Sequence, residues 1–176
     1  MEKVRKSKSG GTVSASVGPG GHYNACVASV IREYRPADFD NLWRMDQDCF
    51  APGIAYSKQE LKTYIRSKST FTLVGVDAKD SIRGFIVAHV SQIGHIITID
   101  VAQEARRSGL GSLLLLSAER RLREGGSHAI GLETAVDNVT ALAFYKRHGY
   151  HVVRTWPRYY SNGVDALVLR KDLDRA

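Results

Sequence analysis

The feature that most constrains the fold is a sharp change of residue type within residues 96–119. The segment opens with β-branched residues at Ile96, Ile97, Ile99 and Val101, a short apolar run that predicts a β-strand. Beyond Ser112 the chain continues with long residues that are not branched at Cβ, which predict a helix. Between the two stands the turn Arg106-Arg107-Ser108-Gly109-Leu110-Gly111-Ser112. A strand that leads through such a turn into a helix indicates an α/β fold.

The turn at residues 106–112 has the properties of an anion-binding site. The first amides of a helix have no partner within the helix and carry the positive end of its dipole. Gly109 and Gly111 allow the backbone to turn these amides toward a ligand, and Arg106 and Arg107 add charge that suits phosphate. The spacing matches neither the P-loop nor the dinucleotide-binding fingerprint. A glycine-rich turn with solvated arginines is the alternative interpretation.

Length and composition predict one soluble globular domain. The chain has 176 residues, 43% of them hydrophobic, and no apolar run approaches the roughly 20 residues of a membrane span. Residues 1–8 are basic but lack the apolar region of a secretory signal, so we predict a cytoplasmic protein without membrane attachment. Cys26 and Cys49 are too few for a disulfide framework or a metal cluster, and reduced thiols are expected.

The formal net charge of +7 favours acidic partners, such as a phosphorylated cofactor or a nearby ribosome. There is no zinc-finger spacing and no aromatic RNA-binding motif, so no direct nucleic-acid binding is predicted, and solubility plus a basic tail explains the charge equally well.

Residues 1–27 are rich in Gly, Ser and Lys and are predicted to form a flexible basic tail. Residues 28–176 are predicted to form the folded domain.

The other elements follow from periodicity and from turn residues. A capping box at Ser57 and Glu60 starts a helix, and glycines at residues 125–126 end another. Two segments, 95–101 and 128–135, are joined by a helix and should therefore pair in parallel. The predicted strands are 28–34, 71–77, 82–92, 95–101, 128–135, 150–156 and 164–170, and the predicted helices are 38–49, 58–66, 113–124 and 138–148. This order predicts a mixed sheet of about seven strands flanked by about four helices.

A second motif follows the predicted parallel pair. Residues 132–150 read L-E-x-x-x-x-N-x-x-A-x-x-F-Y-x-x-x-G-Y. Together with Arg106-x-x-Gly109-x-Gly111, about 25 residues upstream, this segment resembles the GNAT superfamily of N-acetyltransferases, whose acetyl-CoA motif is [RQ]-x-x-G-x-[GA]. The resemblance covers roughly residues 28–172 and implies a single-domain GNAT fold. Gly94-His95-Ile96 and Arg158-Tyr159-Tyr160 are similar to the RimI-like and Ard1-like enzymes, which acetylate N-terminal α-amines.

The resemblance implies acetyl-CoA as cosubstrate and no metal. The cofactor's pyrophosphate would lie on the amides of residues 106–112, and its pantetheine arm would pair with the backbone of Ile99 and Val101 like an added strand. Asn138 would donate a hydrogen bond to this arm, although a plain helix N-cap is an equally suitable role. Tyr145 would contact the cofactor near its sulfur.

Transfer of an acetyl group from a thioester to an amine needs a neutral amine, a stabilised oxyanion and a proton for the leaving thiolate. A backbone amide near Val101 is suited to the oxyanion, and Tyr145 is the candidate general acid, with a core tyrosine as the alternative. Glu133 and His95 are the candidate bases. We favour Glu133, because a lone histidine on a strand is more often structural.

The expected acceptor is the N-terminal α-amine of a protein or peptide, with a ribosomal protein as one candidate. The loop before the second helix is unusually apolar for an exposed connection, which indicates binding or, alternatively, packing onto the core. The candidate substrate-binding residues are Phe50, Pro52, Gly53, Ile54, Tyr56, Tyr159 and Tyr160. Two alternatives stay open, a small-amine acetyltransferase for polyamine or antibiotic and a non-catalytic acetyl-CoA-binding module.

Overall fold

The structure, a computed structural model, describes residues 29–50 and 54–173 of the chain. The tail predicted for residues 1–27 lies outside the described residues, as do the candidate substrate residues Pro52 and Gly53.

The described residues contain the strands and helices in the predicted order. The strands are β1 Val30–Glu33, β2 Thr70–Val76, β3 Ile82–His89, β4 Ile93–Val101, β5 Ala129–Ala135, β6 His151–Trp156 and β7 Ala166–Asp172. The helices are α1 Phe39–Cys49, α2 Lys58–Arg66, α3 Leu110–Glu124 and α4 Val139–Arg147. Single 3-10 turns, Pro36–Asp38 and Gln103–Ala105, precede α1 and follow β4.

The helix boundaries follow from local sequence. The predicted capping box at the start of α2 is present, since Ser57 Oγ accepts from the Glu60 amide and Glu60 Oε2 accepts from the Ser57 amide. The third helix begins at Leu110 and not after Ser112, because Gly109 in the left-handed region (φ 90°) already ends the turn. The last strand also differs from its predicted range, running from Ala166 to Asp172 instead of 164–170.

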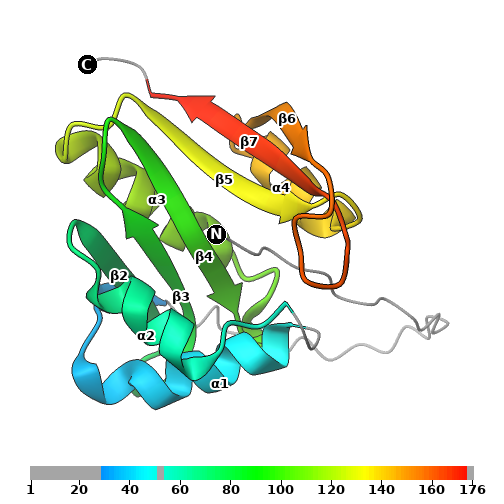
Figure 1. Ribbon diagram of the computed structural model, residues 1–176. Coiled ribbons are helices and arrows are strands. Elements are labelled where there is room, and N and C mark those ends of the chain that lie inside the picture. The colour runs from blue at the N-terminus through cyan, green and yellow to red at the C-terminus, as the bar shows by residue number, and fades with distance from the viewer. Residues whose placement is uncertain (1–28, 51–53, 174–176) are drawn as a thin grey trace, which may run out of the picture.

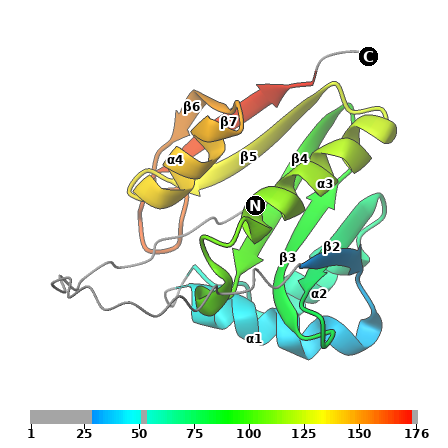
Figure 2. The ribbon, with the colours of Figure 1, turned by 180° about the vertical axis from the view of Figure 1, so that it is seen from behind.

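The described strands form one sheet in the order β1-β2-β3-β4-β5-β7-β6. Within it β4 and β5 run parallel, as predicted, and the other neighbours are antiparallel. Two apolar cores cover the two faces: α3 and α4 pack over one face, whereas α1 and α2 pack over the other (Figures 1 and 2). The sheet is therefore a central layer, and a residue's position along a strand decides which pair of helices it faces.

The parallel pair separates soon after it begins. β4 and β5 are paired only from Ile93–His95 to the residues 129–131, although both strands continue beyond this point, and Figure 1 shows them apart at their carboxyl ends. The Ala102 amide donates to Arg83 O on the β3 side (2.9 Å). Because backbone groups alternate along a strand, the N–H groups of Ile99 and Val101 then point away from β3 and toward the side that β5 has left.

A β-bulge in β4 fixes one substrate candidate in the core. Val87 pairs with Thr98 and Ala88 with Ile96, so Ile97 has no residue opposite it. Its carbonyl instead accepts a hydrogen bond from the Tyr56 hydroxyl (3.3 Å). Tyr56 is only 2% exposed and packs with α1 and α2. The Tyr56 hydroxyl thus bonds to the bulge in this structure, and contact of Tyr56 with the substrate stays a prediction.

Candidate active site

The turn before α3 has the backbone geometry of an anion site. Arg107 (φ 62°) and Gly109 (φ 90°) both adopt left-handed conformations, which is the kind of turn that gathers successive amides on one side. Gly109 is the N-cap of α3 and has no side chain to accept from the amides that follow, although Ser108 Oγ accepts from the Leu110 amide at 3.4 Å. A Cβ built at Gly109 meets nothing within 4 Å, so its φ angle, and not crowding, calls for glycine.

Arg106 differs from the other residues of this turn. The sequence assigned its charge to phosphate, but the guanidinium donates from Nε to Val101 O (3.1 Å) and from Nη2 to Cys49 Sγ (3.5 Å). In this structure Arg106 therefore ties the end of β4 to the end of α1. Of the two arginines, Arg107 is the exposed one and the one placed to meet a bound anion.

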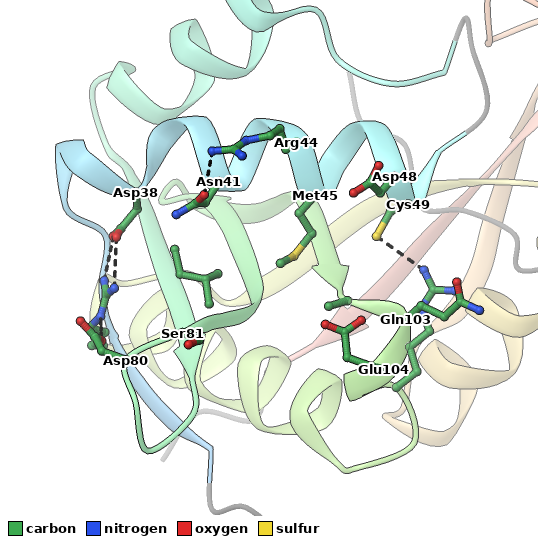
Figure 3. Close-up of a pocket in the computed structure, with 14 residues that line it drawn as sticks. Asp38, Asn41, Arg44, Met45, Asp48, Cys49, Asp80, Ser81, Gln103 and Glu104 are labelled. Carbon is green, nitrogen blue, oxygen red and sulfur yellow. Dashed lines mark hydrogen bonds and ion pairs between the residues drawn. The ribbon is translucent and has the colours of Figure 1, made fainter.

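Cys49 lies in a polar groove of about 890 Å³ between α1, the β2–β3 turn and residues 102–106 (Figure 3). Burial raises the pKa of its thiol to about 11, and the neighbouring Asp100 carboxylate acts in the same direction. Of the predicted site residues that the structure describes, only Arg106 lines this groove. The sequence did not single out Cys49 as a neighbour of the site, because its contacts lie 52 and 57 residues away along the chain.

Asn138 has the N-cap role, one of the two roles considered for it from the sequence. Its side-chain oxygen caps α4 by accepting from the Ala141 amide (3.1 Å). The side chain is fully buried, and its Nδ2 has no hydrogen-bond partner among the described residues. A buried donor without a partner is costly, so this nitrogen suits a ligand carbonyl brought to the start of α4.

The two candidate bases are in direct contact. His95 is the last residue of β4 that pairs with β5, and its Nε2 lies 2.9 Å from Oε2 of Glu133, two residues beyond this pairing on β5. Both side chains lie on the sheet face that carries α1 and α2, because Ile96 and Leu132 next to them belong to the core under α3 and α4. Glu133 is 8% and His95 30% exposed. An ionised carboxylate only accepts, so with Glu133 in this form Nε2 of His95 carries the hydrogen of this contact.

Tyr145 lies on the opposite face, fully buried in the core under α3 and α4. Its ring makes edge contacts with Phe144 (centroids 5.2 Å apart) and Tyr150 (5.4 Å). The interpretation of Tyr145 as a core residue is thus correct for its ring. A cofactor sulfur would have to reach its hydroxyl from the place where β4 and β5 separate.

Aromatic residues gather beyond the carboxyl end of β5. Ile54 and Tyr159 pack against a buried cluster of Ala135, Tyr160 and Ala166, so the loop after α1 and the connection between β6 and β7 meet here. Tyr159 is partly exposed, whereas Tyr160 (2%) and Phe50 (9%) are buried. Trp156 stacks at 5.3 Å on Tyr159 and was missed, although the W-x-x-Y-Y spacing was a signal for an aromatic group.

No group of three or more His, Cys, Asp or Glu residues that could hold a metal ion occurs in the part of the chain that the structure describes. Likewise, no helix within residues 29–50 and 54–173 is long and apolar enough to cross a membrane.

Residues 39–150 match the Acetyltransferase (GNAT) family, and the chain belongs to this family. The fold and the order of the two sequence motifs agree with this assignment. The chain is accordingly a GNAT-type N-acetyltransferase, a class of enzymes that uses acetyl-CoA.

Two relatives and one solved structure show which members of the family the chain is similar to. The chain is 29% identical over 144 residues to an uncharacterized N-acetyltransferase of Methanocaldococcus jannaschii, covering 81% of this chain and 90% of the relative. It is 25% identical over 159 residues to an N-alpha-acetyltransferase of Sulfurisphaera tokodaii, covering 81% and 92%. The crystal structure of Ard1 from Thermoplasma volcanium superimposes with a TM-score of 0.77 at 29% identity, covering 85% of this chain and all of Ard1.

Proposed function

We propose that this enzyme transfers the acetyl group of acetyl-CoA to the N-terminal α-amine of a protein or peptide. The observation that carries the proposal is the His95–Glu133 pair, placed where β4 and β5 separate. An open strand edge lies on one side of this point, and an apolar loop and aromatic residues lie beyond the end of β5. The similarity to an N-alpha-acetyltransferase of S. tokodaii supports the choice of an α-amine.

The cosubstrate supplies an acetyl group activated as a thioester. Its pyrophosphate is assigned to the backbone amides at the start of α3, with Arg107 nearby. The amides of Ile99 and Val101 offer strand-like hydrogen bonds to its amide-containing arm, and Asn138 Nδ2 offers a third donor. The donors to the pyrophosphate and to the arm come from the start of α3, from β4 and from the start of α4. Together they fix the direction of the bound cofactor as well as its position.

The chain's own groups then handle the protons. An α-amine has a reference pKa of about 8, so at neutral pH most of it must lose a proton before it can attack. The His95–Glu133 pair accepts this proton, and we assign to Glu133 the negative charge that drives its transfer. A backbone amide near Val101 is assigned to the oxyanion, and the Tyr145 hydroxyl is the assigned donor to the leaving thiolate.

The acceptor side is assigned to Ile54 and Tyr159, which the sequence suggested, together with Trp156, which stacks on Tyr159. These groups suit the first side chain and the backbone of a peptide, since they combine apolar surface with hydroxyl and indole donors. Association with the ribosome and a cytoplasmic location stay predictions from the sequence.

A peptide screen tests the proposal. Short peptides that differ in their first residue are compared with matched peptides whose N-terminus is blocked and which carry an internal lysine, and with free polyamines, with CoA release as the readout. We expect turnover only with free N-termini and a clear preference among first residues. Acetylation confined to internal lysines or polyamines would overturn the α-amine assignment, while leaving the GNAT class intact.

A further inference from the structure

A histidine outside the predicted site contacts the turn that is assigned to phosphate. His148 follows the last residue of α4, and its Nε2 lies 3.0 Å from Ser112 Oγ in the first turn of α3. Its Nδ1 lies 2.8 Å from Phe144 O, and its ring stacks on the Phe144 ring with centroids 4.5 Å apart. The imidazole is therefore held at both nitrogens and cannot rotate without losing these contacts.

The partner of Nδ1 decides where the hydrogen atoms are. A carbonyl oxygen only accepts, so Nδ1 of His148 carries a hydrogen in either charge state. In the neutral ring Nε2 is then an acceptor, and the Ser112 hydroxyl must donate its hydrogen to it. In the protonated ring Nε2 donates to Ser112 Oγ, and the hydroxyl hydrogen becomes available to another acceptor.

Ser112 lies beside the amides assigned to the cofactor's pyrophosphate, at an end of α3 where the N-cap residue, Gly109, has no side chain. We propose that His148 is a positioning residue for phosphate binding, which switches the Ser112 hydroxyl from a donor to His148 into a donor to the bound phosphate. Protonation of His148 and binding of phosphate are therefore coupled, and each favours the other. This inference rests on the acetyl-CoA site of the proposed function.

Near neutral pH the charged groups on the elements around His148 include four basic side chains and one carboxyl group. The lysines and arginines keep their charge in this range, and the buried Glu119 carboxylate is paired with Lys171 Nζ at 2.6 Å. Histidine is the side chain that ordinarily changes charge between pH 5 and 8. These charged residues are Lys146 and Arg147 on α4, Arg107 before α3, Glu119 on α3 and Lys171 on β7. The Lys171 side chain lies near Gly149.

The coupling is tested by calorimetric binding of 3′-dephospho-CoA between pH 5.5 and 8.5. This ligand carries the pyrophosphate but lacks the phosphate monoester, whose own second ionisation near pH 6 would obscure the result. For the wild type we expect affinity to fall about tenfold as the pH rises, the value of one additional charge-assisted hydrogen bond. Binding heats compared in two buffers of different ionisation enthalpy should also show proton uptake near neutral pH.

Two variants separate the coupling from general damage. His148→Gln offers an amide that does not titrate, so its affinity should be nearly independent of pH, and Ser112→Ala should lose most of the pH dependence although His148 is kept. Melting curves confirm that each variant is folded, and Ser112→Ala remains informative if His148→Gln does not fold. Wild-type pH dependence in either folded variant would overturn the inference. Absence of CoA binding by the wild type at every pH would overturn the acetyl-CoA site itself and this coupling with it.

Discussion

At the scale of single residues, the His95–Glu133 contact joins two roles that the sequence had treated as alternatives. Glu133→Gln keeps the length of the side chain and an oxygen that accepts from His95 Nε2, but it removes the charge. We expect kcat to fall by about 10²-fold or more at pH 6.5, and by less at pH 9, where the α-amine loses its proton unaided. The measurement is the pH profile of kcat for both proteins. An equal deficit at every pH would remove Glu133 from proton transfer.

Tyr145 allows a comparable test of the leaving-group step. Tyr145→Phe removes only the hydroxyl and keeps a ring that is fully buried between Phe144 and Tyr150. We expect kcat to fall about 10² to 10⁴-fold, the range for one positioned acid, with acetyl-CoA affinity and melting temperature nearly unchanged. Single-turnover rates and calorimetry measure the two effects separately. A variant with full kcat would leave Tyr145 as a core residue only.

The buried thiol of Cys49 gives a prediction that does not depend on the proposed function. Because its pKa is raised to about 11, the protonated thiol is favoured by folding. This contribution to stability is complete below the unfolded value of about 8.5 and is lost as the pH rises toward 11. In a Cys26→Ser variant, where Cys49 is the remaining cysteine, the rate of disulfide exchange with an aromatic disulfide should be slow and still rising between pH 8 and 10. A plateau near pH 9 would contradict the raised pKa.

At the scale of elements, the two ends of α3 supply a matched pair of glycines. Gly109 and Gly126 both have φ near 90°, and a Cβ at either position meets nothing within 4 Å. Alanine should therefore cost similar stability at both, about 1 kcal/mol from the left-handed backbone. Only Gly109→Ala should also weaken acetyl-CoA binding, because it alone alters the turn that presents the amides. Equal binding by the two variants, measured by calorimetry, would argue against a phosphate site at this turn.

The elements themselves were largely predictable from sequence, and their long-range contacts were not. The β-branched run of β4 and the capping box of α2 are local signals, and they placed these elements within a few residues. The parallel pairing of β4 and β5 followed from the helix between them. At the bulge, Ile97 O accepts a hydrogen bond from the Tyr56 hydroxyl, 41 residues away along the chain, and no local sequence pattern indicates this contact. The direction of Arg106 likewise depends on Cys49, a residue on another element.

At the scale of the whole molecule, the sheet divides the assigned functions between its faces. Tyr145 and the turn before α3 belong to the α3 and α4 side, whereas Glu133, His95 and the apolar loop belong to the α1 and α2 side. Where β4 and β5 separate, the layer between the two sides is interrupted. Cofactor and acceptor are thus assigned to opposite faces, and the reacting atoms to the single place where groups from both faces meet. With this assignment we propose direct transfer in a ternary complex, because neither substrate has to leave before the other binds.

The described domain begins with β1, so the chain before it can be tested for its contribution to folding. Residues 1–21 contain few apolar side chains that would offset the entropy of ordering them, and their removal lowers the formal net charge from +7 to +4. We expect this truncation to change the melting temperature by no more than about 1 °C and to leave acetyl-CoA affinity nearly unchanged at physiological ionic strength. Leu122→Ala, at a fully buried position of α3, is the control for sensitivity and should cost about 2 to 5 kcal/mol. A loss on truncation comparable to that of Leu122→Ala would show that residues 1–21 pack against the domain.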